Sequence, residues 1–423
     1  MGALKRFIEA LVPRQLYRAI VRPYHFLITY AAALRHGFPA KKLTVILVTG
    51  TKGKSSVTEM LFATLRHASI KTAVAGTIRF AINDETRPNL YKMTMPGRGF
   101  IQAFLAEAVA KGATHAVIEV TSEATLQYRH LFLYPNALVF TNLQKEHIES
   151  HGSFERYASA KLSIAKELLS SPKSPRAIIA NADNEHSAPY LALPLENVLP
   201  FSYADATDVV LHPGSVSFSV DDTHFDMHLP GSFSIMNALA VIRAARFLGV
   251  PLSGIADALA KLERIPGRTE RIEEGQDFHA IVDYAHTPDS LAALYAAYPS
   301  RKICVLGNTG GGRDTWKRPS MGAIADQECD EVILTNEDPY DEDPTAIVDA
   351  MAAGMKRAPK IIMDRREAIR AALSLARTGD AVLVTGKGTD PYIMGANGTK
   401  TPWSDAEVVR EELRKLKGTP GSM

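Results

Sequence analysis

The sequence predicts an α/β fold, with a central P-loop-type parallel-sheet domain, a C-terminal Rossmann-like α/β domain and a short N-terminal helical arm. The chain has 423 residues, which is too long for one ordinary core, so two or three domains are expected. From residue 43 onward, short β-branched runs alternate with helical periods, as in parallel α/β sheets. A glycine-rich turn after the first run marks a candidate ligand site.

The expected elements follow from the hydrophobic periodicity. Strands are expected at residues 43–48, 116–120, 137–141, 177–180, 280–283, 303–307, 331–335 and 381–385. Helices are expected at 57–68, 100–110 and 158–169. Residues 208–230 alternate around turn residues and predict an antiparallel hairpin attached to the first domain, before a helix at 234–248.

The segment 264–268 contains Pro and Gly between two charged residues and is expected to be a linker. We therefore divide the chain into an arm (1–40), a central domain (41–265) and a C-terminal domain (266–423).

The composition excludes several classes of protein. The 48 basic and 46 acidic residues nearly cancel, so the bulk charge does not indicate nucleic acid binding. No apolar run is long enough to span a membrane. Cys304 and Cys329 are too few for a disulfide framework and lack metal-site spacing, so a reducing cytoplasm is the simplest interpretation.

The first 40 residues contain six basic residues among aliphatic and aromatic ones, with Glu9 as the only acidic residue. Two interpretations stay open: a helical arm that packs on the body of the protein, or a basic amphipathic segment that lies on an anionic membrane surface. A cleaved signal peptide is not expected, because the apolar stretch 26–34 runs into Arg35 and His36.

A candidate phosphate-binding loop joins the first strand to the first helix. Its backbone N–H groups and the helix N-terminus suit phosphate oxygens. Lys54 is placed to reach the terminal phosphates and Ser55 to help hold Mg²⁺. A strict Walker A motif has glycine where this chain has Val48. The loop consists of Gly50, Thr51, Lys52, Gly53, Lys54, Ser55 and Ser56.

Two further residues at strand ends suggest a metal site. Glu119 ends one buried strand and His147 follows the next. Side chains at the carboxyl ends of neighbouring parallel strands face the ligand crevice, where a carboxylate and an imidazole can bind Mg²⁺.

The Thr-Gly-Thr-Lys-Gly-Lys-Ser-Ser loop resembles that of the Mur ligases and their relatives, the folylpolyglutamate synthases and cyanophycin synthetases. The resemblance extends from residue 43 nearly to the C-terminus. It is strongest to the MurE type at residues 283–289, Asp-Tyr-Ala-His-Thr-Pro-Asp.

The resemblance implies catalytic roles for Lys54, Glu119, His147 and Lys161, with ATP and two Mg²⁺ ions as cofactors. Ser55, Glu119, His147 and Lys161 would hold the metal. Lys161 lies in a Tyr-x-x-Ala-Lys pattern whose lysine is carbamylated in the family, so a carbamate is expected here. Glu149 replaces the usual aspartate two residues after His147.

The resemblance also implies residues that bind nucleotide and acceptor. Asn237 would contact adenine, and Arg268, Asp283 and His286 would contribute to the nucleotide site. The acceptor would be contacted by Thr94, Ser122, Gln127 and Arg129. Glu123 stands where a histidine is usual, and the Met-Thr-Met-Pro loop at 93–96 matches the family's Thr-Thr-Pro loop only in part.

The amino-acid site departs from the family's pattern in two places. Arg313, Asp338, Tyr340, Gly386 and Asp390 are its expected members. Tyr340 stands where diaminopimelate-adding enzymes have arginine, and Asp390 replaces a glutamate. The uncharged tyrosine predicts a preference for lysine or ornithine.

The resemblance therefore implies an ATP-dependent amide ligase that adds a diamino acid to a UDP-MurNAc-dipeptide-like peptidoglycan precursor through an acyl phosphate. It would act as a monomer on small molecules in the cytoplasm, with possible membrane contact through residues 1–40. Only about 40 residues precede the phosphate-loop strand, too few for the family's UDP-binding domain. A lipid-linked or other non-UDP peptide or polyglutamate acceptor is one alternative, and a non-catalytic ATP-binding scaffold is another.

Overall fold

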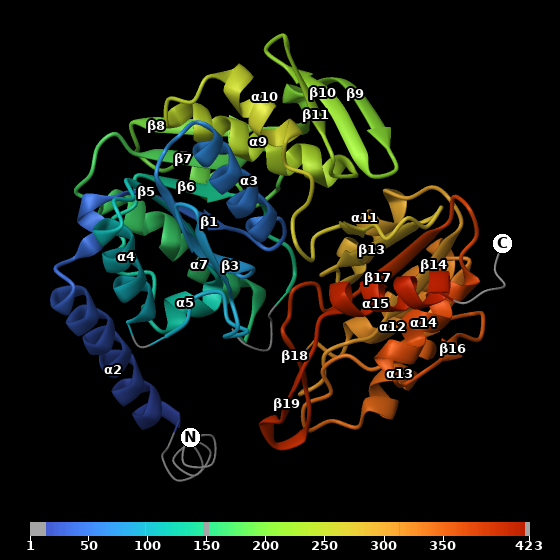
Figure 1. Ribbon diagram of the computed structural model, residues 1–423. Helices are drawn as coiled ribbons and strands as arrows, with labels where there is room; N and C mark the ends of the chain where they lie inside the picture. The colour runs from blue at the N-terminus through green and yellow to red at the C-terminus, as the bar shows by residue number, and fades with distance from the viewer. Residues whose placement is uncertain (1–13, 98, 147–151, 313, 419–423) are drawn as a thin grey trace. The chain divides into compact units, whose positions relative to one another are not determined.

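The computed structural model describes residues 14–97, 99–146, 152–312 and 314–418 and divides into two compact units (Figure 1). The first unit comprises Met1–Lys145, Ser150–Phe201 and Ala240–Val250, and the second comprises Glu146–Glu149, Ser202–Leu239 and Pro251–Met423. Both units contain a mostly parallel sheet with helices, which confirms the predicted fold class.

The first unit is built on an eight-stranded sheet in the order β4-β3-β2-β5-β1-β6-β7-β8. The strands from β2 to β8 are parallel, whereas β3 and β4 form an antiparallel edge. The strands are β1 (Thr44–Thr49), β2 (Thr72–Ala75), β3 (Arg79–Ile82), β4 (Glu85–Pro88), β5 (His115–Glu119), β6 (Ala137–Phe140), β7 (Ala177–Asn181) and β8 (Asn197–Phe201). The predicted strands in this region agree with β1, β5, β6 and β7 to within one or two residues.

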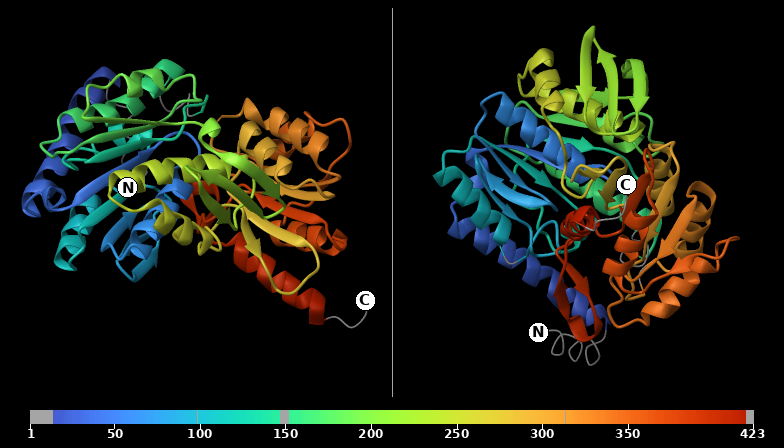
Figure 2. Two further views of the ribbon diagram at one scale, coloured as in Figure 1. Left: turned by 90° about the horizontal axis from the view of Figure 1, so that it is seen from above. Right: turned by 45° about the vertical axis from the view of Figure 1, so that its right-hand side comes forward.

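The central strand β1 is buried along nearly its whole length, because helices cover the sheet on both faces (Figure 2). Alternate residues of β1, Val45 and Leu47, belong to a core that also contains residues of α4 and α7. The helices of the unit are α3 (Lys54–His67), α4 (Phe100–Ala110), α5 (Ser122–Leu126), α7 (Phe154–Leu169) and α8 (Ala188–Leu191).

The N-terminal arm is helical where the structure describes it. Helix α2 (Arg14–Arg35) is followed by the short helix η1 (Pro39–Lys42), which leads into β1. Lys173 Nζ donates a hydrogen bond to the carbonyl oxygen of Ala40 at 2.7 Å, and another to that of Leu43, which fixes this connection. Of the helices in the described residues, none is long and apolar enough to cross a membrane.

Residues 207–227 form a three-stranded antiparallel sheet rather than a single hairpin. Its strands are β9 (Thr207–His212), β10 (Ser215–Val220) and β11 (Thr223–Met227), and it follows η2 (Tyr203–Asp205). It belongs to the second unit together with α10 (Leu252–Ala260), which packs on β11. Helix α9 (Ser232–Phe247) is divided between the two units at residue 239.

The second unit contains a six-stranded sheet in the order β12-β13-β17-β14-β15-β16. Only β12 is antiparallel to its neighbour. The strands are β12 (Glu270–Ile272), β13 (His279–Asp283), β14 (Lys302–Leu306), β15 (Glu331–Leu334), β16 (Lys360–Ile361) and β17 (Ala381–Thr385), with a hairpin of β18 (Tyr392–Met394) and β19 (Lys400–Pro402) around η3 (Ala396–Gly398). The predicted strands in this half of the chain are confirmed.

Alternate residues of β14 point into two different cores, as expected for a strand covered on both faces. Cys304 and Leu306 contact the helices of one face, and Ile303 and Val305 contact those of the other. The first face carries α11 (Pro288–Ala296), α12 (Lys317–Glu328) and α13 (Pro344–Ala352), and the second carries α14 (Arg365–Leu375) and α15 (Asp405–Gly418).

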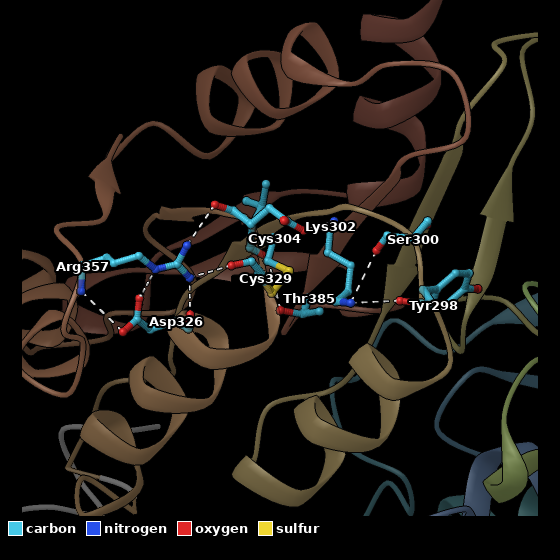
Figure 3. Close-up of a disulfide and its surroundings, with 10 residues drawn as sticks. Tyr298, Ser300, Lys302, Cys304, Asp326, Cys329, Arg357 and Thr385 are labelled. Atoms are coloured by element: carbon cyan, nitrogen blue, oxygen red, sulfur yellow. Dashed lines mark hydrogen bonds and ion pairs between the residues drawn. A yellow bond between two sulfur atoms is a disulfide. The ribbon is translucent and has the colours of Figure 1, made fainter.

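Cys304 and Cys329 form a disulfide inside the first of these cores (Figure 3). Cys304 lies on β14 and faces α12, and Cys329 is the residue that ends α12. Both side chains are buried. From the sequence we expected unpaired cysteines and a reducing compartment, and the disulfide does not support that expectation. The pairing could not be predicted from the sequence, because Cys304 and Cys329 meet only when α12 packs on β14.

A buried ion pair joins the two helices of the opposite face. Arg365, the first residue of α14, donates to Asp405, the first residue of α15, with its Nε at 2.8 Å and its Nη2 at 2.6 Å from the carboxylate oxygens. Arg365 Nη2 also donates to the carbonyl oxygen of Thr385 at the end of β17, at 2.8 Å. Both side chains are at most 1% exposed, so each charge depends on the other.

We predict that Asp405→Asn lowers the free energy of unfolding of the second unit by about 3–5 kcal/mol, because it removes the hydrogen-bonded counter-charge of the buried Arg365 guanidinium. Urea unfolding followed by tryptophan fluorescence measures this, since Trp316 and Trp403 are the chain's two tryptophans. The matched control is Glu411→Gln, which removes a half-exposed partner of Arg366 and should cost less than about 1 kcal/mol. Equal losses in the two variants would contradict the prediction.

Candidate active site

The predicted phosphate loop lies between the carboxyl end of β1 and the start of α3. Gly50 directly follows β1, and a Cβ atom there would lie 1.9 Å from Thr141 Oγ1, so no other residue fits at this position. Helix α3 begins at Lys54 with Gly53 as its N-cap, in the left-handed conformation. A helix N-terminus that follows such a turn has a partial positive charge and suits a phosphate group.

The loop is held in place by residues that follow β6. Asn142 accepts hydrogen bonds from the N–H groups of Thr51, through its carbonyl oxygen, and of Lys52, through Oδ1, both at 2.9 Å. Thr51 Oγ1 lies 2.9 Å from the hydroxyl of Tyr157 on α7. These contacts fix the loop before any ligand binds, which reduces the entropy lost on binding.

Two lysines lie at this loop. Lys54 Nζ donates to the carbonyl oxygen of Thr51 at 2.8 Å, and Lys161 Nζ donates to that of Gly50 at 2.5 Å. Lys161 comes from α7 and is almost completely buried. The structure therefore brings Lys161 to the phosphate loop although more than 100 residues separate them in sequence.

Glu119 connects the phosphate loop to the loop that carries Thr94. Its Oε1 accepts a hydrogen bond from Ser55 Oγ at 3.0 Å, and its Oε2 accepts one from the N–H of Thr77 at 2.8 Å. The hydroxyl of Thr77 is in turn 2.7 Å from that of Thr94. A continuous polar chain thus runs from the first turn of α3 to Thr94.

The oxygen atoms of Glu119 and Ser55 are donors of the kind that Mg²⁺ prefers, usually as one or two carboxylates with phosphate oxygens and water. These two residues therefore fit a magnesium ion at a bound nucleotide. The described ranges contain no group of three or more His, Cys, Asp or Glu side chains that could hold a metal. His147, the remaining expected ligand, lies outside the described residues.

The expected acceptor residues Gln127 and Arg129 are brought together with the loop at 93–97. Arg129 Nη1 donates to the carbonyl oxygen of Met95 at 2.5 Å and contacts Met93 Sδ at 2.8 Å, and its Nη2 donates to Gln127 Oε1. Burial lowers the pKa of Arg129, although the guanidinium remains charged at any physiological pH. Ser122 is buried at the start of α5, the helix that leads into Gln127 and Arg129.

In the second unit, polar side chains gather where the parallel strands end. Asp283 ends β13, Asn308 follows β14, Glu337 follows β15 and Lys387 follows β17. The carboxyl edge of a parallel sheet is where α/β proteins bind their ligands. This edge therefore forms a second candidate site, within the second unit.

Glu337 is the least satisfied residue of this edge. Its Oε1 accepts a hydrogen bond from Thr309 Oγ1 at 2.8 Å, whereas its Oε2 is buried and has no hydrogen-bond partner in the described part of the chain. Burial, and then the neighbouring carboxylate of Asp338, raise the pKa of Glu337. Gly386 makes room for it, since a Cβ there would lie 2.2 Å from Oε2.

Asp338, the next residue in the chain, has hydrogen-bond donors that Glu337 Oε2 lacks. Its Oδ1 accepts from Lys387 Nζ and from the N–H of Met394, each at 2.8 Å. Lys387 Nζ is also 3.8 Å from Asp390. Tyr340 has a left-handed backbone conformation and lies against Gly311, and its N–H donates to the carbonyl oxygen of Met394.

The C-terminal residues that we expect at the nucleotide mostly contact other residues of the segment 268–286. Asp283 accepts hydrogen bonds from the N–H groups of Thr269 and Ala285, both at 2.6 Å. His286 Nδ1 is 2.7 Å from the carbonyl oxygen of Tyr284, and Arg268 lies over the Tyr284 ring at 4.4 Å.

Asn237 is half-buried on the part of α9 that belongs to the second unit. Arg313, expected to hold the amino acid, lies outside the described residues.

Sequence reasoning did not single out Thr77, Tyr157 or Glu337 as site residues. Tyr157 begins the Tyr-x-x-Ala-Lys pattern of Lys161, and Glu337 directly precedes Asp338, so nearness in sequence was the available signal. Thr77 had no such signal, because only the pairing of β2 with β5 brings it to Glu119. The bonding of Lys387 to Asp338 was likewise not predictable, since the two residues follow different strands.

The chain matches two family profiles, the Mur ligase middle domain over residues 48–245 and the Mur ligase, glutamate ligase domain over residues 267–388. It is 36% identical over 392 residues to a protein of Caldanaerobacter subterraneus subsp. tengcongensis named UDP-N-acetylmuramoyl-L-alanyl-D-glutamate–2,6-diaminopimelate ligase, covering 89% of this chain and 79% of that protein. It is 34% identical to the UDP-N-acetylmuramyl-tripeptide synthetase of Roseiflexus sp., covering 91% and 81%.

Solved structures show the same relationship. A structure of a UDP-N-acetylmuramoyl-L-alanyl-D-glutamate–2,6-diaminopimelate ligase matches with a TM-score of 0.61 and 28% identity, covering 89% of this chain and 79% of that one. The folylpolyglutamate synthase of Mycobacterium tuberculosis matches with a TM-score of 0.70, covering 99% and 98%, but at 17% identity, so it shows the fold alone.

We predict that Glu337→Gln raises the free energy of unfolding of the second unit at pH 8. The folded-state pKa of Glu337 is raised, so the wild type loses stability as the pH rises from the unfolded-state pKa, about 4.3, through the folded-state pKa. The glutamine has no such cost, and its advantage should disappear near pH 4. Urea unfolding at both pH values measures the difference.

Glu342→Gln is the matched control for this measurement. Arg318 holds the pKa of Glu342 below its usual value, so this variant should lose stability at pH 8 rather than gain it. A loss of stability in Glu337→Gln at pH 8 would show that the carboxylate of Glu337 is stabilised after all.

Proposed function

This chain belongs to the Mur ligase family, whose members are ATP-dependent, ADP-forming ligases, and from that premise we propose its reaction. It joins a diamino acid to the carboxylate of a UDP-N-acetylmuramoyl-L-alanyl-D-glutamate-type precursor of peptidoglycan. The relatives that are 34–37% identical to it are named for this reaction. The chain spans 76–85% of the length of these relatives.

The observation that carries the proposal is the polar chain from Ser55 through Glu119 and Thr77 to Thr94. It links the loop that suits the phosphates of ATP to the loop that contacts Arg129. A ligase of this type must bring an acceptor carboxylate to the γ-phosphate of ATP. The carboxylate of Glu119, which bonds to Ser55 and to Thr77, holds the two loops in a fixed relative position.

In the first step the acceptor carboxylate attacks the γ-phosphorus of ATP, the bond to the bridging oxygen breaks, and an acyl phosphate and ADP form. Lys54 is proposed to neutralise the charge on the phosphoryl oxygens, and Arg129 to orient the acceptor. Ser55 and Glu119 would hold Mg²⁺, which supplies further electrostatic stabilisation of these oxygens.

In the second step the amine of the incoming amino acid attacks the acyl carbon and loses a proton, and phosphate leaves from the tetrahedral intermediate. We propose that the strand ends of the second unit bind this amino acid. Glu337 supports this, because a buried carboxylate oxygen without a hydrogen-bond donor is suited to an ammonium group. Asp390 is the second carboxylate expected there.

We propose that the protein acts on small molecules as a monomer in the cytoplasm, with contact to a membrane through residues 1–40. ATP and nucleotide-linked precursors are available on that side of the membrane. Two Mg²⁺ ions and a carbamate on Lys161 complete the proposed site.

The reaction is tested by phosphate release with ATP and UDP-N-acetylmuramoyl-L-alanyl-D-glutamate, with one amino acid added at a time. Release should require both acceptor and amino acid, and Lys54→Ala should abolish it in a protein with unchanged circular dichroism. Phosphate release that does not depend on the acceptor would exclude this acceptor, and full activity of Lys54→Ala would exclude the assigned phosphate loop.

We predict that Lys161→Ala is inactive and is partly rescued by acetate or formate, which can supply the anion that a carbamate would place near the phosphate loop. The buried position of Lys161 beside Gly50 supports this. In the wild type, ¹³C-labelled bicarbonate should give a carbamate signal in the NMR spectrum that is missing from the variant. Identical spectra would remove the carbamate from the mechanism, whatever the activity.

We predict that kcat/KM is higher for L-lysine or L-ornithine than for meso-diaminopimelate, by roughly a hundredfold or more. A buried carboxylate left without its partner costs about 3–5 kcal/mol, and each 1.4 kcal/mol is about tenfold. Tyr340 offers no charge to the distal carboxylate of diaminopimelate, which is the substrate named for most of the relatives.

The matched variant is Tyr340→Arg, which should raise kcat/KM for meso-diaminopimelate and leave KM for ATP unchanged. A preference of the wild type for meso-diaminopimelate would contradict the assignment of Tyr340 as the residue that sets this specificity.

A further inference from the structure

The outward face of α2 is apolar. Tyr24, Leu27, Ala31 and Leu34 follow one another at intervals of three and four residues, so they share one side of the helix. All four are exposed, Leu27 and Leu34 by about 60%. No charged residue lies between Pro23 and Leu34. A soluble helix normally presents charged residues on its exposed side, so this face requires an explanation.

A neighbouring side of α2 attaches it to residues 127–134, which include Gln127 and Arg129 and are called the acceptor loop below. Phe26 packs its ring 6.1 Å from that of Tyr128 and 5.9 Å from that of Phe132, and Tyr30 also contacts Phe132, at 5.6 Å. Tyr128 lies between Gln127 and Arg129, the expected acceptor residues. All three views show α2 at the rim of the first unit (Figures 1 and 2).

Residues next to this loop also expose apolar side chains. Leu126, directly before Gln127, is 43% exposed, and Met93, which contacts Arg129, is 45% exposed. Leu90 and Tyr91 on the same loop as Met93 are exposed by more than half. Exposed apolar side chains are therefore found both on α2 and on the residues around Arg129.

The charge of this region selects one kind of partner. The segment Arg14–Arg35 contains four arginines and no acidic residue, and Lys41 and Lys42 follow it. A second copy of the chain would place this cationic helix against itself in a two-fold interface, which is unfavourable. An anionic lipid surface offers both a counter-charge and an apolar layer, and tyrosine rings are favoured at its boundary.

We propose that α2 is a docking surface for an anionic lipid bilayer and that it holds the acceptor loop at the membrane. The exposed stripe enters the boundary between headgroups and acyl chains, and the basic residues pair with the headgroups. The enzyme would then take its acceptor at the bilayer surface. This consequence rests on the proposed ligase reaction, whereas the docking, which assigns residues to the membrane contact proposed above, does not depend on that reaction.

The test is co-sedimentation of the full chain with vesicles of phosphatidylglycerol and phosphatidylcholine, compared with vesicles of phosphatidylcholine alone. Binding should require the anionic lipid and weaken in 0.5 M salt. Leu27→Glu with Leu34→Glu should weaken binding by about a hundredfold or more, since two exposed leucines no longer enter the lipid. The matched control is Val210→Glu with Leu211→Glu, two similarly exposed residues on β9 with the same change in charge.

Phosphate release with the water-soluble acceptor separates docking from catalysis. It should be the same in wild type and in the α2 variant, because neither leucine belongs to the site. Loss of vesicle binding with unchanged activity supports the proposal. It is overturned if the wild type does not bind anionic vesicles, if the two double variants bind equally, or if the wild type is a dimer that the α2 variant converts to a monomer.

Discussion

The carboxylate of Glu119 is the constraint on which the first unit's site depends. A buried carboxylate is kept in a protein only if donors surround it, and Glu119 obtains them from Ser55 and Thr77. Ser55 belongs to the first turn of α3, and Thr77 follows β2, so one side chain on β5 fixes two loops from its neighbouring elements. The close approach of Gly50 to Thr141 and the bonds from Asn142 complete this fixation from the other side of β1.

Three buried acidic side chains of the second unit differ in how the fold compensates their charge. Asp405 has Arg365, and Asp338 has Lys387, so the charge of each is compensated within the fold. Glu337 is equally buried but has a single hydroxyl donor at one oxygen. The fold compensates Asp405 and Asp338 but not Glu337, so keeping Glu337 lowers the stability of the unit. Such a cost is typical of residues retained for binding.

Helix α2 contacts the loop of Gln127 and Arg129 on one side and exposes an apolar face on another. Its inner side packs aromatic rings on the loop of Gln127 and Arg129, so the position of the helix and that of the loop are coupled. Three residues of that loop, Tyr128, Phe132 and Tyr134, have left-handed backbone conformations, which are unfavourable for aromatic residues and persist only where packing enforces them. The arm thus contributes to the shape of the acceptor loop as well as presenting an apolar face.

The sequence by itself determined the fold class, the order of the strands along the chain and the family, and it predicted the phosphate loop. These features are local: a buried strand, a Gly-Thr-Lys-Gly-Lys turn and a helix start are written in consecutive residues. The same holds for the helical arm and for most residues expected at the site, which stand in short motifs.

The tertiary structure alone decided which of these residues meet. Thr77 reaches Glu119 because β2 pairs with β5, and Cys329 reaches Cys304 because α12 packs on β14. Lys387 reaches Asp338 across the carboxyl edge of the sheet, although β14 lies between β17 and β15. The tertiary structure also decided which residues are buried. In the sequence Glu337 resembles any acidic loop residue, and only in the folded chain do Gly386 and Thr309 enclose it. Contacts between residues distant in sequence depend on strand order and helix packing, and neither leaves a signal in the residues that end up in contact.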